Sequence, residues 1–167
     1  MEDKELSNYL IREIKSDEVG ILKDMLYEAI FQLDETNLLS REVIEQPELS
    51  VFISNWGRSD DLCLVAESDG KIVGAVWTRI LAGEVKGFGN IDDQTPEFAI
   101  SLYKEYRNQG IGTALMKRML QHLKNQGYKQ ASLAVQKENY AVKMYKNVGF
   151  EIVANLEEEY LMVHNLS

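Results

Sequence analysis

The stretch that decides the fold is Arg107-Asn108-Gln109-Gly110-Ile111-Gly112-Thr113. It follows a strand-like run over Phe98 to Tyr103 and leads into a helix predicted over Thr113 to Lys124. The start of a helix presents unpaired N–H groups and the positive end of the helix dipole. Glycine there lets the backbone approach a phosphate closely, and an arginine beside it adds charge. The pattern therefore indicates a binding loop for an anion such as a pyrophosphate.

Two better-known phosphate motifs do not fit this loop. A P-loop needs a lysine after its last glycine, but Gly112 is followed by Thr113. A dinucleotide-binding G-x-G-x-x-G needs glycine or alanine at position 115, where Leu115 stands. On spacing alone, a glycine-rich turn that merely enters a helix is an equal alternative to the anion site.

Outward from the loop, hydrophobic periodicity and turn residues predict a mixed α/β fold. In the first half, the expected elements are a strand over 9–14, a helix capped by Ser16 with apolar residues as far as Leu33, a helical region over 40–56, and a hairpin of strands 62–67 and 71–78 around Asp69-Gly70. A mobile loop is expected over 81–95, with a short strand extension as an alternative. After it come strand 98–103, helix 113–124, strand 131–135, a short helix capped by Asn139, and strands 150–153 and 160–163. This order predicts a twisted, mixed and mostly antiparallel central sheet flanked by helices.

Length and composition predict one domain over residues 1–167 and exclude several classes of protein. The chain is 45% hydrophobic and 27% charged, which is ordinary globular usage. Its 18 basic and 27 acidic residues give a net charge of −9, which disfavours nucleic acid but does not exclude a small anion in a local pocket. Cys63 is the one cysteine and the two histidines are far apart, so neither a disulfide nor a metal site is expected.

No membrane or secretory segment is predicted. The longest apolar runs are far shorter than the ~18 residues that suggest a membrane span. The stretch from Met1 to Glu5 is acidic and lacks the basic-then-apolar pattern of a signal peptide. The expectation is a cytoplasmic protein without a membrane partner, and a homodimer is a reasonable prior for such a protein.

Several segments in register resemble one family. The 107–113 stretch resembles the Arg/Gln-x-x-Gly-x-Gly/Ala signature of the Gcn5-related N-acetyltransferase (GNAT) superfamily. Upstream, Ala99-Ile100-Ser101-Leu102 is similar to that family's cofactor-flanking strand. Downstream, the stretch from Asn139 to Phe150 is similar to its Asn-x-Ala-x-x-x-Tyr-x-x-x-Gly-Phe segment, and Glu159-Tyr160-Leu161-Met162 resembles its last strand. The resemblance covers about 97–162 and implies a GNAT-like acyl-CoA N-acyltransferase fold.

The resemblance implies a set of cofactor contacts. Acetyl-CoA is the usual donor of the family and serves as a co-substrate. The backbone of Ile100, Ser101 and Leu102 should pair with the pantetheine arm like an added strand. The pyrophosphate should be held beside Arg107 by the N–H groups of Asn108, Gln109, Gly110, Ile111, Gly112 and Thr113. The Asn139 amide should reach the pantetheine arm, although a plain helix cap is the alternative and the two roles are compatible.

The resemblance also implies catalytic roles. Tyr145 would be the general acid that protonates, or hydrogen-bonds to, the leaving thiolate, whereas its pattern alone favours a core tyrosine. Glu97 is the candidate base, acting directly or through water, against the alternative of a solvated carboxylate, and Glu138 is the second choice. The N–H of Leu102 should polarise the thioester carbonyl. Because Cys63 stands in a strand expected to be buried, direct transfer in a ternary complex is preferred to a covalent route.

The acceptor is the least determined partner. The family implies a primary amine of a small molecule or protein, and the acidic surface favours a cationic one such as a polyamine, an aminoglycoside, a lysine side chain or an N-terminal amine. Its pocket is expected between the first two helices, the 81–95 loop and the central strands, and could include the aromatic residues Phe31, Trp77, Phe88 and Tyr103. A non-catalytic acyl-CoA-binding or regulatory module and an unrelated nucleotide-binding α/β protein are the alternatives.

Overall fold

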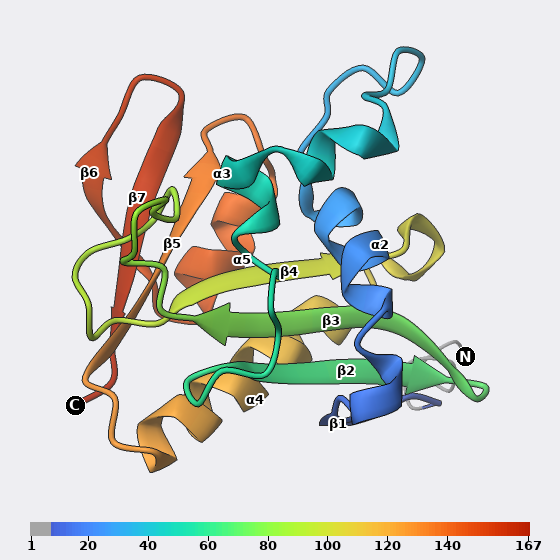
Figure 1. Ribbon diagram of the computed structural model, residues 1–167, viewed down its shortest axis with the longest axis horizontal. Coiled ribbons are helices and arrows are strands. Elements are labelled where there is room, and N and C mark those ends of the chain that lie inside the picture. Colours follow the sequence, from blue (N-terminus) through green and yellow to red (C-terminus); the bar gives the residue numbers. More distant parts are fainter. Residues whose placement is uncertain (1–7) are drawn as a thin grey trace.

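A computed structural model describes residues 8–167, so the acidic N-terminal stretch from Met1 to Glu5 lies outside the described residues. Within them, seven strands form one sheet in the order β1-β2-β3-β4-β5-β7-β6 (Figure 1). The strands are β1 Leu10–Glu13, β2 Leu62–Ser68, β3 Lys71–Arg79, β4 Glu97–Leu102, β5 Gln130–Gln136, β6 Glu151–Asn155 and β7 Glu159–Asn165. Every neighbouring pair is antiparallel except β4 with β5, which confirms the mixed, mostly antiparallel sheet.

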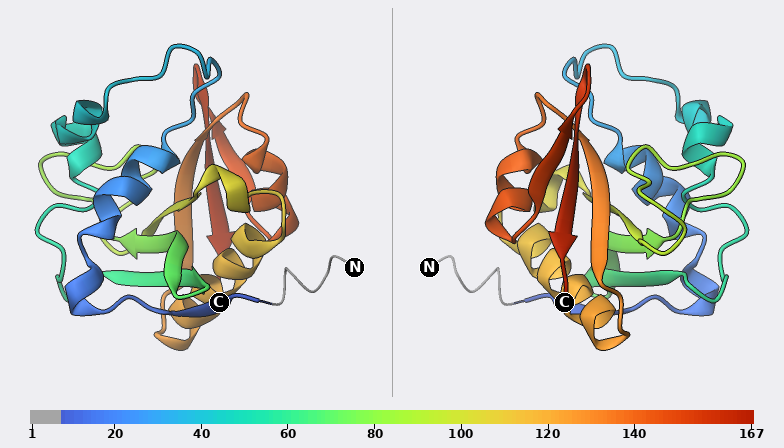
Figure 2. Two further views of the ribbon diagram at one scale, coloured as in Figure 1. Left: turned by 90° about the vertical axis from the view of Figure 1, so that its right-hand side faces the viewer. Right: turned by 90° about the vertical axis from the view of Figure 1, so that its left-hand side faces the viewer.

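Helices cover both faces of this sheet (Figure 2). They are η1 Ser16–Glu18, α2 Ile21–Ala29, η2 Arg41–Glu45, α3 Pro47–Ser50, η3 Lys104–Tyr106, α4 Ile111–Asn125 and α5 Ala141–Asn147. The first four lie on one face and α4 and α5 on the other. The two faces therefore carry separate apolar clusters, one under α2 and one under α4.

The buried stripe of α4 shows why this helix forms where the periodicity predicts. Leu115, Met119 and Leu123 are completely buried against the sheet. Each such side chain contributes roughly 1.5–3 kcal/mol through burial. On the other face Leu22 and Met25 of α2 do the same.

The first helix is shorter than its apolar spacing predicts. It ends at Ala29, and Leu33 is 68% exposed in the following loop. Polar side chains stabilise that loop, because Gln32 Oε1 accepts from the N–H of Leu39 and Asp34 Oδ1 accepts from that of Thr36. Such local bonds offer the backbone an alternative to the helix. The prediction that the helix extends to Leu33 is therefore wrong.

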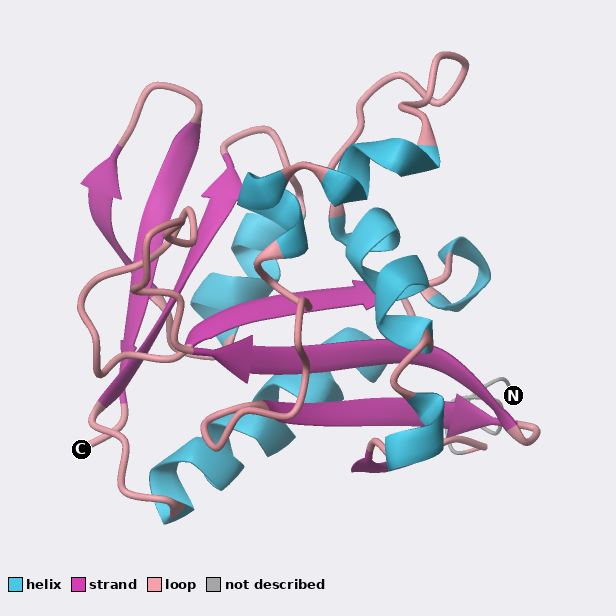
Figure 3. Cartoon of the chain, in the orientation of Figure 1, coloured by secondary structure: helices cyan, strands magenta, loops and turns pink. Residues whose placement is uncertain are grey.

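The predicted 40–56 helical region is divided at Gln46, whose extended backbone precedes Pro47 at the first position of α3. The 62–78 hairpin is confirmed, with Asp69 and Gly70 both at positive φ in its turn. The 81–95 segment contains neither helix nor strand (Figure 3).

The parallel pair at the centre of the sheet separates almost as soon as it begins. One register pair, Glu97 with Ser132, joins β4 to β5. Beyond it the two strands diverge, with β4 running across the molecule and β5 turning away (Figure 1). The stretch 98–102 of β4, called the open edge below, therefore has β3 on one side and no ladder partner on the other within residues 8–167.

Candidate active site

The register of β3 and β4 decides which backbone groups reach the open edge. The N–H of Tyr103 donates to the Val73 carbonyl at 3.0 Å, which makes this pair a hydrogen-bonded one. Because antiparallel pairing alternates, Ile100 and Leu102 direct their N–H and C=O groups away from β3. The side chain of Ser101 points toward α2, where its Oγ donates to the Met25 carbonyl at 2.7 Å. Of the three predicted strand residues, Ile100 thus presents both its backbone groups to an added chain, and Leu102 presents its N–H, because the Leu102 carbonyl accepts from Arg107.

The 107–113 loop lies directly beyond this strand. Asn108 and Gly110 take left-handed conformations, with φ of 62° and 88°, and α4 begins at Ile111. The conformation at Gly110 is one that other residues adopt only with strain. No atom lies within 4 Å of a Cβ built at Gly110, so the loop is uncrowded where the first helical N–H groups are unpaired.

Gly112 is where three elements meet. A Cβ built there would lie 3.3 Å from Met144 Sδ of α5 and 3.5 Å from Leu102 Cδ1 of β4. The close packing brings the open edge, the start of α4 and the helix that carries Tyr145 to one place. The structure therefore gathers most of the predicted cofactor residues, which are far apart in the sequence.

The side chain of Arg107 fastens the loop rather than pointing freely from it. Its Nε donates to the Leu102 carbonyl at 3.0 Å, and its Nη2 pairs with Glu28 Oε1 at 3.2 Å. These bonds join the end of β4 to α2. Glu28 has no motif around it that could have indicated this contact from the sequence.

For Asn139 and Tyr145, at and near α5, the sequence offers a structural role and a functional role. Asn139 Oδ1 accepts from the N–H of Ala141 at 2.9 Å, so the helix-cap role is confirmed. Tyr145 is 9% exposed, and its ring lies edge-on to Phe150 with centroids 6.2 Å apart. Its hydroxyl has no hydrogen-bond partner within residues 8–167. Burial raises the pKa of Tyr145 to about 12, so the phenol stays protonated.

Glu97 is a buried carboxylate and not a solvated one. It is 2% exposed, Oε2 accepts from the N–H of Gly89 at 2.8 Å, and Oε1 has no partner among the described residues. Burial raises its pKa to about 7; the Gly89 bond opposes this shift and the charge of Glu159 adds to it. The group therefore titrates where a general base should. Glu138, the second choice, is exposed.

Two further expectations are decided by burial. Cys63 is buried in β2, and burial raises the pKa of its thiol, so it is no nucleophile. Trp77 is 1% exposed, and its Nε1 donates to the Phe52 carbonyl at 3.1 Å. Trp77 is thus a core residue and does not line an acceptor pocket. Phe88, by contrast, is 47% exposed.

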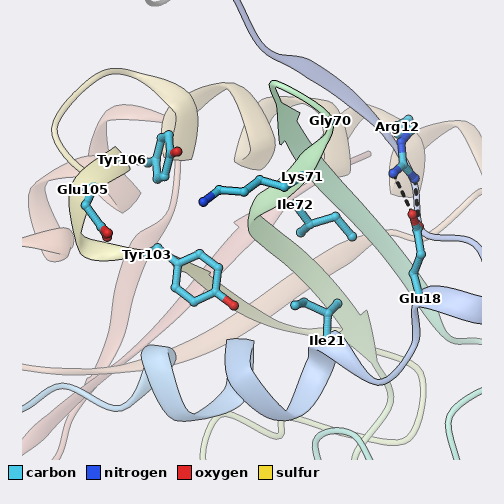
Figure 4. A pocket seen from close by; sticks show the side chains of 9 residues that line it. All are labelled: Arg12, Glu18, Ile21, Gly70, Lys71, Ile72, Tyr103, Glu105 and Tyr106. Atoms are coloured by element: carbon cyan, nitrogen blue, oxygen red, sulfur yellow. Dashed lines mark hydrogen bonds and ion pairs between the residues drawn. The ribbon is translucent and has the colours of Figure 1, made fainter.

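A cavity lies just beyond the end of the open edge, where Tyr103 lines it (Figure 4). It has a volume of about 610 Å³, and Lys71 extends into it between Tyr103, Tyr106 and Glu105. It is bounded by α2, the β2–β3 turn and η3. None of its lining residues is a predicted cofactor contact.

Among residues 8–167, no cluster of three or more histidine, cysteine, aspartate or glutamate side chains could hold a metal ion. No helix in that part of the chain has the length and apolar character to cross a membrane.

The chain belongs to the Acetyltransferase (GNAT) family, whose family model matches residues 27–150. The predicted resemblance is confirmed.

Relatives of this chain include acetyltransferases with different names. A mycothiol acetyltransferase from Saccharomonospora viridis is 28% identical over 100 residues, 59% of this chain and 32% of the relative. An N-alpha-acetyltransferase from Sulfurisphaera tokodaii is 29% identical over 113 residues, 65% of this chain and 68% of the relative. The chain thus spans about a third of the first relative and about two thirds of the second.

Solved structures agree in fold. The PaiA N-acetyltransferase from Thermoplasma acidophilum, in complex with coenzyme A, superposes with a TM-score of 0.68 at 19% identity, covering 94% of this chain and 98% of that one. Agreement at that identity establishes the fold and leaves the substrate open.

Proposed function

We propose that this chain is an acetyl-CoA-dependent N-acetyltransferase that passes the acetyl group directly to a primary amine in a ternary complex. The observation that carries the proposal is the alignment of the open edge with the loop at the start of α4. The backbone groups of Ile100 and the N–H of Leu102 have no ladder partner on this side and could pair with an extended arm, and the start of α4, with its unpaired N–H groups, packs beside Leu102.

The residues of the open edge and the 107–113 loop fit the pantetheine arm and the pyrophosphate of acetyl-CoA. The pantetheine arm would lie along Ile100 and Leu102, with the Asn139 amide nitrogen on its other side, since the amide oxygen already accepts from Ala141. The pyrophosphate would rest on the N–H groups of 108–113, where Gly110 leaves open space. Arg107 contributes by holding this loop against β4, and its charge remains nearby. An acidic protein can bind an anion in this way because the oriented backbone dipoles are local.

Three groups would carry the chemistry. Bound acetyl-CoA supplies an activated thioester, which an amine attacks without a covalent enzyme intermediate. The N–H of Leu102 stabilises charge on the acyl oxygen. Tyr145 donates a hydrogen bond to the departing sulfur. Because an ordinary thiol titrates near 8.5 and Tyr145 near 12, hydrogen bonding is favoured over complete proton transfer.

Glu97 would accept the proton that an ammonium must lose before attack. It stands three residues before Ile100, or roughly 10 Å along an extended strand, so a water relay is needed. Its pKa of about 7 allows it to hold and release a proton near neutral pH. The net charge of −9 favours cationic acceptors, and the relatives' names place several kinds of acceptor within the family.

Calorimetry and turnover together test the proposal. Acetyl-CoA should bind, while ATP and NAD should not, because the loop fails both of their motifs. A thiol-release assay over a panel of polyamines, aminoglycosides, aromatic amines and lysine peptides then identifies the acceptor. Binding without release of CoA on any amine supports the non-catalytic module instead, and absence of CoA binding overturns the whole proposal.

The Tyr145→Phe variant tests the donor role. Removing a hydrogen bond to a charged group should lower kcat on the order of tenfold or more while the Kd for acetyl-CoA is unchanged. Tyr128→Phe, beyond the far end of α4, is the matched control. Equal kcat in Tyr145→Phe and wild type would make Tyr145 a core residue only.

A further inference from the structure

The middle of the 81–95 loop straddles the carboxylate of Glu97. The N–H of Gly89 donates to Glu97 Oε2 at 2.8 Å. On the other side, a Cβ built at Gly87 would lie 2.0 Å from Glu97 Oε1. The segment Gly87-Phe88-Gly89, called the clip below, thus bonds one carboxylate oxygen and passes close to the other, which keeps no hydrogen-bond partner among the described residues.

The clip is fastened at both ends. Ser132 Oγ of β5 donates to the Gly89 carbonyl at 2.7 Å, and the N–H of Gly87 donates to the Leu81 carbonyl at 3.0 Å. A Cβ built at Gly89 would lie 2.7 Å from the carbonyl carbon of Leu133, in the backbone of β5. Since no side chain fits there without moving a strand, glycine at 89 is a packing requirement.

Between the two glycines, Phe88 contacts the turn that follows α3. Its ring stacks on Phe52 with centroids 6.2 Å apart and an interplanar angle of 23°. Phe52 is buried, whereas Phe88 is 47% exposed. Phe52 also belongs to the apolar cluster that packs against Ala99 of β4, on the face of the sheet that α2 covers. The half-exposed ring of Phe88 is therefore adjacent in sequence to Gly89, whose N–H bonds the candidate base Glu97.

We propose that the clip determines acceptor specificity, with Phe88 contacting an aromatic or large apolar group attached to the acceptor's amine. The inference rests on the proposed function and narrows its acceptor class. Phe88 is preorganised by Phe52, so little ordering is needed for a second ring to stack on it. The bond from Gly89 to Glu97 fixes the distance between the Phe88 ring and the base. The clip would therefore link the choice of acceptor to the removal of the acceptor's proton.

A pair of amines tests the inference. Wild type and Phe88→Ala are assayed for thiol release with 2-phenylethylamine and with ethylamine, which lacks the ring. Phe88→Ala should lower kcat/KM for 2-phenylethylamine about tenfold, mainly through KM, and leave ethylamine nearly unchanged. Val85→Ala, an exposed apolar residue of the same loop, should change neither. A purely structural role for Phe88 would move both amines alike.

Gly89→Ala tests the other half of the clip. Displacing the backbone from β5 should lower kcat for both amines, because Glu97 loses its fixed position, while Gly83→Ala has no neighbour within 4 Å and should have no effect. If Gly89→Ala fails to fold, the Phe88→Ala selectivity decides.

The outcomes separate this inference from the proposed function. Equal losses on both amines in Phe88→Ala, or no loss on either, overturn the inference. So does wild type that binds acetyl-CoA but does not turn over 2-phenylethylamine. Failure to bind acetyl-CoA instead overturns the proposed function.

Discussion

Asp61 and Glu97 both have side chains that are shielded from solvent, but their surroundings are opposite. The Asp61 side chain is 1% exposed and forms two bonds to Arg79, at 2.6 and 2.9 Å. It also accepts the N–H groups of Gly57 and Arg58, each at 2.8 Å. Glu97 has one backbone N–H and no cation among the described residues.

The register of β3 and β4 places an arginine opposite Glu97. Arg79 is the direct cross-strand partner of Glu97, so the two side chains leave the same face of the sheet. The guanidinium is instead fully used by Asp61, by two carbonyl oxygens of the 51–54 turn and by the Trp56 ring, 5.0 Å from its centroid. The pairing with Asp61 leaves Glu97 buried without a positive charge.

The pKa values follow these partners. Burial by itself would raise the pKa of Asp61, but the Arg79 guanidinium and the two N–H groups outweigh it and hold that pKa below its usual range. For Glu97 burial dominates and the pKa rises to about 7. The comparison teaches that one carboxylate stabilises the fold while the other remains able to exchange a proton.

Asp61→Ala should give the largest effect. It leaves the Arg79 charge buried without its counter-ion, and such losses cost about 3–5 kcal/mol. Urea unfolding measures the free energy, and Asp93→Ala, at an exposed position, is the control. A loss below about 1 kcal/mol would mean that Arg79 can turn to Glu97, which would break the comparison.

Glu97→Gln should have the opposite effect to Asp61→Ala, because it should lower activity and not the stability of the fold. Loss of a positioned base lowers kcat by about a hundredfold, at the lower end of the usual range, because a water relay is involved. Steady-state kinetics with a fixed acceptor measures it. Glu138→Gln on the exposed surface is the matched control, and equal activity of wild type and Glu97→Gln would remove the base role.

The sequence predicts the parts of the site that depend on local pattern. The glycine spacing of 107–113 and the apolar stripe of α4 placed the loop at a helix start, and the Asp69-Gly70 turn placed the hairpin. Local pattern was sufficient there because each feature depends on neighbours within a few residues. The cap at Asn139 followed in the same way.

The different surroundings of Asp61 and Glu97 could not be predicted from the sequence, because they depend on the register of β3 and β4. Arg79 faces Glu97 only once β3 and β4 are paired. Its ion pair with Asp61 joins residues that are 18 positions apart in the sequence. The clip likewise needs Gly89 packed against β5. Three glycines in the 81–95 loop were the available signal, and they indicated a loop without indicating what it covers.

The pH dependence of stability separates the two carboxylates by sign. Because the pKa of Glu97 is about 7 in the folded state and 4.5 ordinarily, the folded protein binds more protons than the unfolded chain between these values. Its contribution to stability is thus full below pH 4.5 and is lost as pH rises through 7. Asp61 acts oppositely: its lowered pKa contributes stability above 3.8 that is constant at neutral pH.

Urea unfolding of wild type, Glu97→Gln and Asp61→Asn at pH 5 and pH 8 therefore gives the smallest but most discriminating effect. The stability of Glu97→Gln relative to wild type should improve by about 2 kcal/mol from pH 5 to pH 8, since only wild type must ionise a buried carboxyl. The deficit of Asp61→Asn should be the same at both pH values, because Asp61 is ionised in both states throughout. A constant difference for Glu97→Gln as well would show that Glu97 is charged already at pH 5, and the two carboxylates would then be alike.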